Sequence, residues 1–233
     1  TLAYYQTEKV PSGIELEKNI LIRLCNTANN YAGSILDDGE TPYRERLTRW
    51  GKLAGALGTW DYGISFNRHA KGLPYPSEFF IQDTLRFYRD HNVRYLFTER
   101  EHEHRSDMHT MKGWLHAKLM ENPDADFNAL FHDFLKNYYG KAAPFIAEYR
   151  KKLLESVKKH RSCITAFMPP AIAFSHLDCT TVSRCDELLQ QAKDAVKDDA
   201  TLLRRVREAR ASIDEAIVIF IRKFNLESPG HRL

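Results

Sequence analysis

The segment GTWDYGISF at residues 58–66 decides the expected fold of this chain. It is a short run rich in aromatic and β-branched residues, which is typical of a strand. Three other runs have a similar character, at residues 1–6, 19–25 (NILIRLC) and 93–98 (VRYLFT). Helical patterns follow the runs at 19–25, 58–66 and 93–98, and this alternation predicts βα units that share a parallel sheet.

The helical patterns between the strands have recognisable starts and ends. The first is expected from Thr41 to about residue 55, because Thr41 can cap a helix and proline follows it at the first helical position. The second is expected to begin at Pro76 and to end near His91. The third is expected at about residues 107–121, before an asparagine that precedes proline and so disfavours helical geometry.

Parallel strands with helical crossovers form either an open doubly wound sheet or a closed barrel. No glycine-rich phosphate loop follows any of the four runs, which removes the main signal for a nucleotide-binding doubly wound sheet. Four strands cannot close a barrel. The predicted class is therefore α/β, with residues 1–122 forming a partial (β/α) TIM-type barrel that contains its C-terminal strands.

After Pro123 the pattern changes to one helix after another. Amphipathic helices are expected at residues 126–139, 141–161, 181–197 and 201–224. Short connections between long helices favour antiparallel packing. We therefore expect residues 123–233 to form an all-α helical domain.

Composition limits the classes of function. The 233 residues are 43% hydrophobic and 28% charged, as in soluble globular proteins, and no apolar run approaches the roughly 20 residues of a membrane span. A net charge of +3 from 34 basic and 31 acidic residues does not predict a nucleic-acid partner. The chain opens on Thr1 without a methionine or a signal-peptide pattern, so an upstream segment is expected to have been removed. The four cysteines permit a disulfide but also fit buried free thiols.

In parallel βα folds the functional side chains gather at the carboxyl ends of the strands. This rule selects eight candidates for a substrate site: Arg23, Cys25, Asn26, Trp60, Asp61, Tyr62, Glu99 and Glu101. The Trp-Asp-Tyr triplet fits a sugar, because an indole covers the apolar face of the ring while a carboxylate accepts hydrogen bonds from its hydroxyls. Alternatively, Trp60 and Tyr62 belong to the core, Asp61 caps a turn and Glu99 is a surface acid.

Glycoside hydrolysis usually needs two carboxyl groups across the scissile bond, and Asp61 with Glu99 could supply them from neighbouring strands. They could also bind hydroxyls while the catalytic acids lie elsewhere. The run EREHEHRSDMH at residues 99–109 contains His102 and His104, but no HExxH helix is present and a solvated loop explains the run better. No metal and no cofactor are therefore predicted.

The chain resembles the bacterial family catalogued as domain of unknown function 4838 over about residues 1–154. The most specific motifs of this resemblance are WDY at 60–62, the strand ending at Glu99, and NPD at 122–124 followed by DF at 133–134 and YYG at 138–140. Similar proteins look related to barrel glycosidases such as hexosaminidases and α-glucuronidases, with a helical domain after the barrel. The resemblance implies polysaccharide metabolism outside the cytoplasm, in a secreted, periplasmic or cell-surface protein. Many relatives have glycine where this chain has Arg100.

Two functions of different class follow from these observations. In the first, the chain is the C-terminal fragment of a carbohydrate-active, glycoside-hydrolase-like protein, forms one wall of a sugar-binding cleft, and is inactive without the missing N-terminal half of the barrel. In the second, it is a non-catalytic carbohydrate-binding or structural module. Exposed strand edges of a partial barrel also raise the hypothesis of dimerisation.

Overall fold

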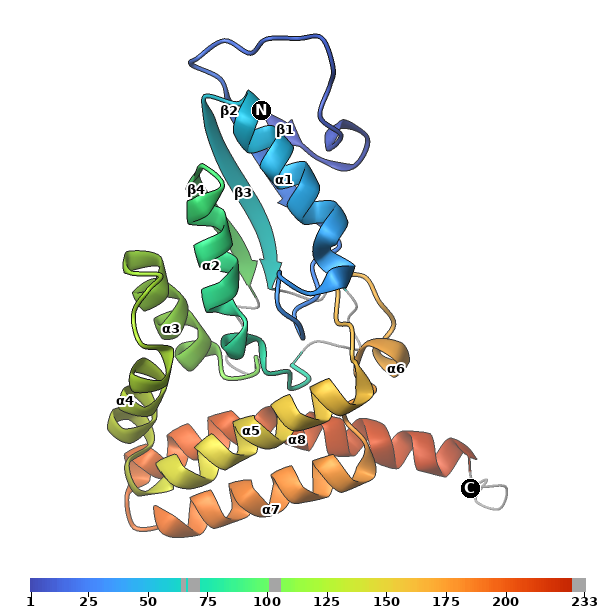
Figure 1. Ribbon diagram of the computed structural model, residues 1–233. Helices are drawn as coiled ribbons and strands as arrows, with labels where there is room; N and C mark the ends of the chain where they lie inside the picture. Colours follow the sequence, from blue (N-terminus) through green and yellow to red (C-terminus); the bar gives the residue numbers. More distant parts are fainter. Residues whose placement is uncertain (64–65, 67–71, 101–105, 228–233) are drawn as a thin grey trace.

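A computed structural model of the chain describes residues 1–63, 66, 72–100 and 106–227. Four parallel strands alternate with helices, and a mostly helical region follows them (Figure 1), so the predicted α/β class is confirmed. The strands are hydrogen-bonded in sequence order and are β1 (Leu2–Ala3), β2 (Leu21–Asn26), β3 (Ala56–Gly63) and β4 (Val93–Arg100).

The first predicted strand is much shorter than residues 1–6. After β1 the chain turns into a short 3-10 helix, η1 (Tyr5–Thr7), in which Tyr5 adopts a positive φ of 48°. Thr7 stabilises this turn, because its Oγ1 accepts a hydrogen bond from the backbone N–H of Tyr4 at 3.1 Å. A local side-chain bond thus competes with the sheet and ends the strand early.

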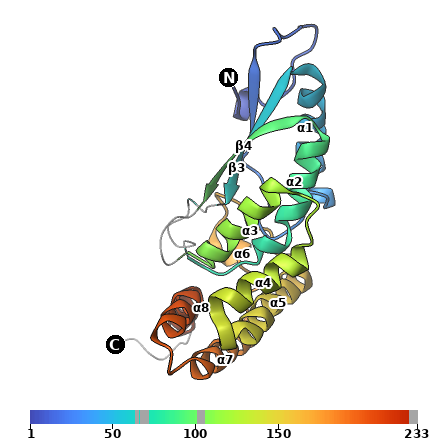
Figure 2. The ribbon, with the colours of Figure 1, turned by 90° about the vertical axis from the view of Figure 1, so that its left-hand side faces the viewer.

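Helices α1 (Thr41–Leu53) and α2 (Ile81–Asp90) cover one face of the sheet (Figures 1 and 2). Right-handed crossovers between strands that add in one direction put successive helices on the same face, as in a barrel. Between this face and the helices lies a compact apolar core that includes Leu24, Leu47 and Leu57. We call this side of the sheet the helix face and the opposite side the open face.

The remaining helices agree with the predicted pattern, with boundaries shifted by a few residues. Asp126 and Asp178 cap two of them by accepting hydrogen bonds from backbone N–H groups three residues ahead. The second predicted helix is preceded by a separate 3-10 turn. The elements are η2 (Asp38–Glu40), η3 (Ser77–Phe79), α3 (His109–Glu121), α4 (Phe127–Tyr139), η4 (Gly140–Ala142), α5 (Ala143–His160), α6 (Pro170–Ala173), α7 (Cys179–Ala195) and α8 (Ala200–Glu227).

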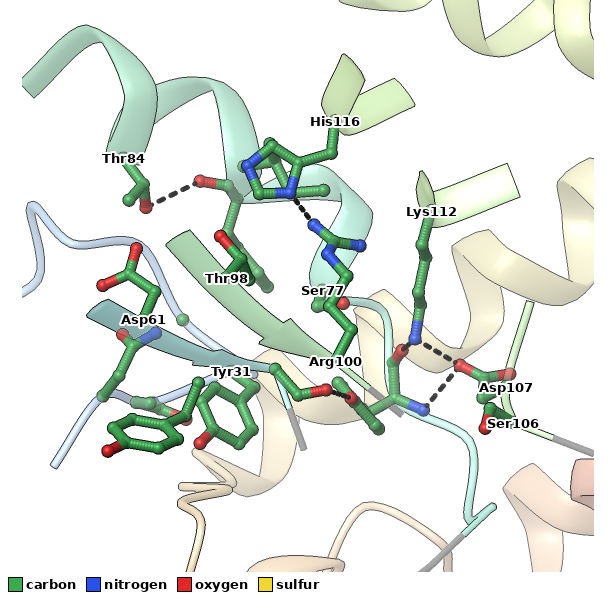
Figure 3. A pocket seen from close by; sticks show the side chains of 18 of the residues that line it. Tyr31, Asp61, Ser77, Thr84, Thr98, Arg100, Ser106, Asp107, Lys112 and His116 are labelled. Atoms are coloured by element: carbon green, nitrogen blue, oxygen red, sulfur yellow. Dashed lines mark hydrogen bonds and ion pairs between the residues drawn. The ribbon is translucent and has the colours of Figure 1, made fainter. Parts of the chain in front are cut away.

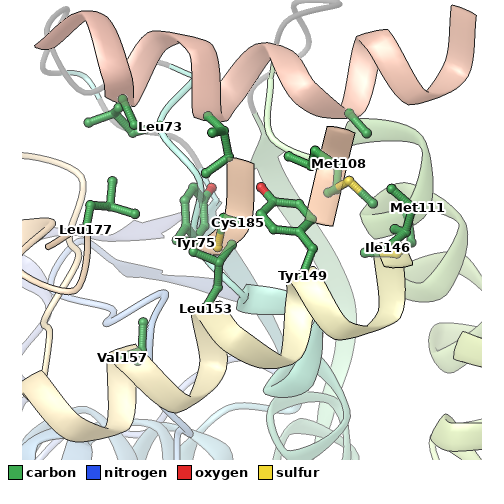
Figure 4. Close-up of a cluster of buried hydrophobic side chains, with 14 of the residues drawn as sticks. Leu73, Tyr75, Met108, Met111, Ile146, Tyr149, Leu153, Val157, Leu177 and Cys185 are labelled. Carbon is green, nitrogen blue, oxygen red and sulfur yellow. The ribbon is translucent and has the colours of Figure 1, made fainter. Parts of the chain in front are cut away.

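One continuous apolar cluster joins the carboxyl end of the sheet to the helical region. It contains Cys25 and Tyr62 from the strands together with Leu115, Tyr149 and Leu189 from the helices. Figure 4 shows its centre, where side chains of α5 meet residues of the segments beside them. Apolar packing is therefore continuous between the sheet and the helices that follow residue 122.

The four cysteines are free thiols. Cys25 and Cys185 are buried, and Cys163 and Cys179 are exposed. Within the residues that the structure describes, none of the helices is long and apolar enough to cross a membrane.

Candidate functional site

Strand register divides the predicted site residues between the two faces of the sheet. Cys25 of β2 pairs with Trp60 of β3, which pairs with Phe97 of β4. The next row runs through Asn26, Asp61 and Thr98, and Tyr62 then pairs with Glu99. Side chains alternate along a strand, so the row of Asp61 shares the helix face with Leu24 and Leu57, whereas Trp60, Tyr62 and Glu99 lie on the open face.

The open face carries a pair of groups suited to a sugar. Trp60 Nε1 donates a hydrogen bond to Glu99 Oε2 at 3.2 Å, and the Trp60 and Phe97 rings meet edge to face with centroids 4.6 Å apart. Both Trp60 and Glu99 are half-buried. Phe97 remains 43% exposed and Tyr95, on the same face, 57% exposed. An indole, a phenyl ring and a carboxylate therefore reach the surface at the ends of two neighbouring strands.

The other open-face candidates lie deeper. Tyr62 and Cys25 are 8% and 2% exposed and belong to the shared apolar core. Burial raises the pKa of the Tyr62 hydroxyl and of the Cys25 thiol above their usual values. A thiol with a raised pKa is a poor nucleophile at neutral pH, so the local environment of Cys25 does not suit covalent chemistry. Arg23 is half-buried on β2, two residues before Cys25.

Asp61 lies on the helix face and is only 6% exposed. Its Oδ1 accepts a hydrogen bond from the Tyr88 hydroxyl at 2.7 Å, and the Tyr43 hydroxyl lies 3.4 Å from that of Tyr88. Burial raises the pKa of Asp61 to about 7, against the lowering effects of the Tyr88 bond and of the Arg100 charge. The carboxyl therefore keeps its proton to a much higher pH than an exposed aspartate does.

The structure does not bring Asp61 and Glu99 into one cleft. Their strands are neighbours, but the two carboxyl groups point to opposite faces of the sheet. Two carboxyl groups that act across one glycosidic bond must face the same space. Glu101 lies outside the residues that the structure describes, as do His102 and His104.

A cavity of about 90 Å³ opens on the helix face at the carboxyl ends of β3 and β4 (Figure 3). Asp61, Thr98 and Arg100 line it from the strands, and Lys112 and His116 line it from α3. Other residues in its wall come from the loop after β2, from η3 and from α2, among them Tyr31, Ser77, Phe80 and Thr84.

Two of the charged groups in the cavity wall have defined partners. Arg100 Nη2 is in hydrogen-bond contact with His116 Nδ1. Lys112 Nζ lies 2.7 Å from Asp107 Oδ2. Burial lowers the pKa of Arg100 and that of Lys112 below their usual values. The wall thus combines both signs of charge.

Sequence reasoning did not single out Thr98, Lys112 and His116. The alternation of side chains along a strand and the spacing of residues on a helix could have identified them. Thr98 follows the alternation of β4 onto the side of Asp61, and Lys112 and His116 are four residues apart on α3, so they lie on one helix face.

Beside the cavity, a fully buried ionic cluster holds the sheet to the helical region. Arg150 of α5 is completely buried and donates to Glu78 Oε1 at 2.6 Å and to Asp107 Oδ1 at 2.8 Å. The backbone carbonyl of Tyr75 accepts from Arg150 Nη2 and from Lys112 Nζ, each at 2.8 Å. Burial raises the pKa of Asp107, but the Arg150 and Lys112 charges outweigh that effect and lower it overall. The cluster contains two acidic and two basic side chains, so it has no net charge, and it stabilises the fold.

Among the described residues, no three histidine, cysteine, aspartate or glutamate side chains are grouped so that they could hold a metal ion.

Comparison with known proteins identifies the family. The family model described as domain of unknown function (DUF4838) matches residues 1–151, which include all four strands and the first half of α5. No curated protein and no solved structure matches the chain. Because the family model covers well over half of the 233 residues, the chain belongs to the DUF4838 family.

Proposed function

We propose that this chain forms one wall of a carbohydrate-binding cleft in a glycoside-hydrolase-like (β/α) barrel protein, and that the sugar lies on the open face of the sheet. The observation that carries the proposal is the hydrogen bond from Trp60 to Glu99 on that face. It holds an indole and a carboxylate together at the carboxyl ends of β3 and β4, the position where barrels bind substrates.

The chemistry of this pair fits a pyranose ring. The Trp60 indole, supported edge to face by Phe97, offers an apolar surface to the C–H face of a sugar. Glu99 accepts the indole N–H through Oε2, which leaves Oε1 for a sugar hydroxyl. Side chains that serve only as core would be buried, whereas Phe97 is 43% exposed. Partial exposure of aromatic groups beside a carboxylate favours ligand binding over core packing.

One carboxyl group on the open face is not sufficient for hydrolysis by the usual mechanism. Asp61 faces the helices, so a second acid would come from outside the described strands. We therefore propose that the N-terminal half of the barrel supplies it and that this chain alone binds sugar without turnover. The family resemblance adds the expectation of a protein that works outside the cytoplasm on polysaccharide.

The second candidate is a binding module without catalysis. The burial of Tyr62 and Cys25 favours it, because these two candidates serve the core and leave Trp60 and Glu99 as the ligand-facing pair. Both candidates predict sugar binding on the open face. They differ only in whether the protein that also contains the preceding barrel strands turns over glycosides.

Two measurements test the proposal in sequence. A panel of neutral oligosaccharides is screened against the chain by protein-observed NMR, with Glu99→Gln as the site variant and Glu121→Gln, an exposed acid of α3, as its control. Binding that Glu99→Gln weakens and Glu121→Gln does not supports the cleft. Turnover of a bound oligosaccharide by the longer protein then favours the enzyme, and binding without turnover favours the module. The absence of any bound oligosaccharide would overturn both.

A further inference from the structure

The cavity opens mainly on the helix face, on the other side of the sheet from Trp60 and Glu99, although Tyr62 of the open face also lines it at the strand ends. Asp61 and Thr98 belong to the helix face, and Trp60 and Glu99 belong to the open face. Whatever the open face binds, its ligand does not reach the cavity through the strands. The cavity therefore needs an explanation of its own.

Several polar groups next to the cavity lack the partners that buried polar groups normally have. Thr98 Oγ1, in the cavity wall, is buried and makes no hydrogen bond. Both side-chain amide atoms of Asn26 are also buried without a hydrogen bond, but Asn26 does not line the cavity. Asp61 is more than nine-tenths buried, and only its Oδ1 is bonded, to Tyr88. Buried polar atoms without partners are costly and rare, so the Thr98 hydroxyl in the cavity wall, beside the partly bonded Asp61, favours a ligand that hydrogen-bonds to it.

These groups lie in one row across the sheet. Asn26, Asp61 and Thr98 are register partners on β2, β3 and β4. Directly paired residues have Cβ atoms roughly 5 Å apart, so a small ligand can contact two of them at once. Figure 3 shows Asp61 and Thr98 next to each other at the strand ends, with Arg100 and His116 farther along the cavity.

The balance of charge in the wall favours a neutral ligand. Lys112 and Asp107 are paired at 2.7 Å and add no net charge. Arg100 is close enough to Asp61 to influence its ionisation, and this guanidinium opposes a cation in the same space. The carboxyl of Asp61 in turn opposes an anion. A hydroxyl can both donate to and accept from a carboxyl and a threonine hydroxyl without bringing charge.

We propose that this cavity is a second binding site, which takes a small neutral polyol through hydrogen bonds to Asp61 and Thr98. The wall also contains the apolar side chains of Phe80, Ile81 and Leu85, against which the carbon skeleton of a polyol packs. Its volume of about 90 Å³ suits a small molecule or one end of a larger one. The site does not include Trp60, Phe97 or Glu99, the groups of the proposed sugar cleft.

Thr98→Val is the variant that tests the site. It removes the unpartnered hydroxyl while keeping the shape of the side chain, so the fold should tolerate it. Thr59→Val is a matched control, because Thr59 has an equally buried, unpartnered hydroxyl on the same face of β3 but does not line the cavity. Asp61→Leu is the second site variant, and Trp60→Ala separates this site from the open face.

The probes are glycerol, erythritol, xylitol and myo-inositol at millimolar concentrations, with acetate and ethylammonium as charged counterparts, in titrations followed by protein-observed NMR. We expect at least one polyol to shift the signals of Asp61 and Thr98, with affinity reduced about tenfold in Thr98→Val or Asp61→Leu and unchanged in Thr59→Val and Trp60→Ala. The proposal is overturned if no polyol shifts these signals, if acetate or ethylammonium binds more tightly, or if Thr98→Val binds as the unmodified chain does.

Discussion

Arg150 and Glu78 form a two-pronged ion pair although 72 residues separate them in the sequence. Arg150 Nε donates to Glu78 Oε1 at 2.6 Å and Arg150 Nη2 donates to Glu78 Oε2 at 3.0 Å, and neither side chain has any exposed surface. The same guanidinium reaches Asp107. Arg150 lies on α5, close to residue 151 where the family match ends, and Glu78 lies on η3, the turn before α2. The ion pair therefore joins α5 to the segment that leads into α2. This contact fixes the strand ends relative to the helical region.

Replacement of Arg150 by Met should destabilise the protein strongly. The variant keeps the length of the side chain but leaves Glu78 and Asp107 buried with only Lys112 as a counter-charge, and breaking a buried pair in this way costs about 3–5 kcal/mol. Urea unfolding followed by circular dichroism measures the loss. Lys152→Met on the same helix is the control, since its partners are exposed and it should change stability by less than about 1 kcal/mol. If both variants lost the same free energy of unfolding, the buried cluster would stabilise the protein no more than an exposed ion pair does.

The stability of the folded chain should decrease through Asp61 as the pH rises. The folded pKa is about 7 and the reference value is 3.8, so within this window the folded chain retains a proton that the unfolded chain has released. Deprotonation near pH 7 then leaves a buried charge in the folded state. We expect Asp61→Asn to be more stable than the unmodified chain by an amount that grows from pH 4 to pH 7, to the order of a few kcal/mol.

Urea unfolding at several pH values across this window checks the Asp61 prediction. Asp133→Asn, a change to an exposed acid of α4, serves as the control and should show no such trend. A stability difference for Asp61→Asn that stays constant with pH would mean that the carboxyl titrates as an ordinary exposed acid does.

His176 should have the opposite dependence on pH. It is completely buried, its Nε2 lies 2.9 Å from the carbonyl oxygen of Pro74, and burial lowers its pKa from 6.5 to about 4. Between these values the unfolded chain binds a proton at this residue and the folded chain does not, so stability decreases as the pH falls. His176→Gln keeps an N–H donor for Pro74 but cannot titrate. The variant should therefore lose less stability than the unmodified chain between pH 6.5 and pH 4, and parallel curves would count against this assignment.

Much of the fold could be predicted from local patterns. Thr41 and Pro42 marked the start of α1, although Glu40 rather than Thr41 occupies the cap position, and Gly140 marked the end of α4. Strand β1 was overestimated because the bonds of Thr7 to the Tyr4 backbone are a local alternative that hydrophobicity does not reveal. The buried cluster of Arg150 could not be anticipated, because an arginine in a basic helical segment usually lies at the surface.

The candidate site was predictable in position but not in detail. The rule of carboxyl strand ends selected Trp60, Asp61 and Glu99, and all three lie at that edge. The sequence alone shows that side chains alternate between the two faces of each strand. Asp61 and Glu99 can be assigned to opposite faces only when the pairing of β3 with β4 is also known. Register depends on pairing between strands distant in sequence, and a shift of one residue would exchange the faces. Only the folded sheet settles which acids share a space.

The most direct test of the account is the affinity of Trp60→Ala for an oligosaccharide that the chain binds, measured by isothermal titration calorimetry beside Trp114→Ala. Trp114 is also half-buried, but it packs against Phe134 in the helical region, away from the open face. We predict that Trp60→Ala weakens binding by at least about tenfold and that Trp114→Ala leaves it unchanged. Equal affinities in the two folded variants, or no oligosaccharide bound by the unmodified chain, would contradict the proposed sugar cleft.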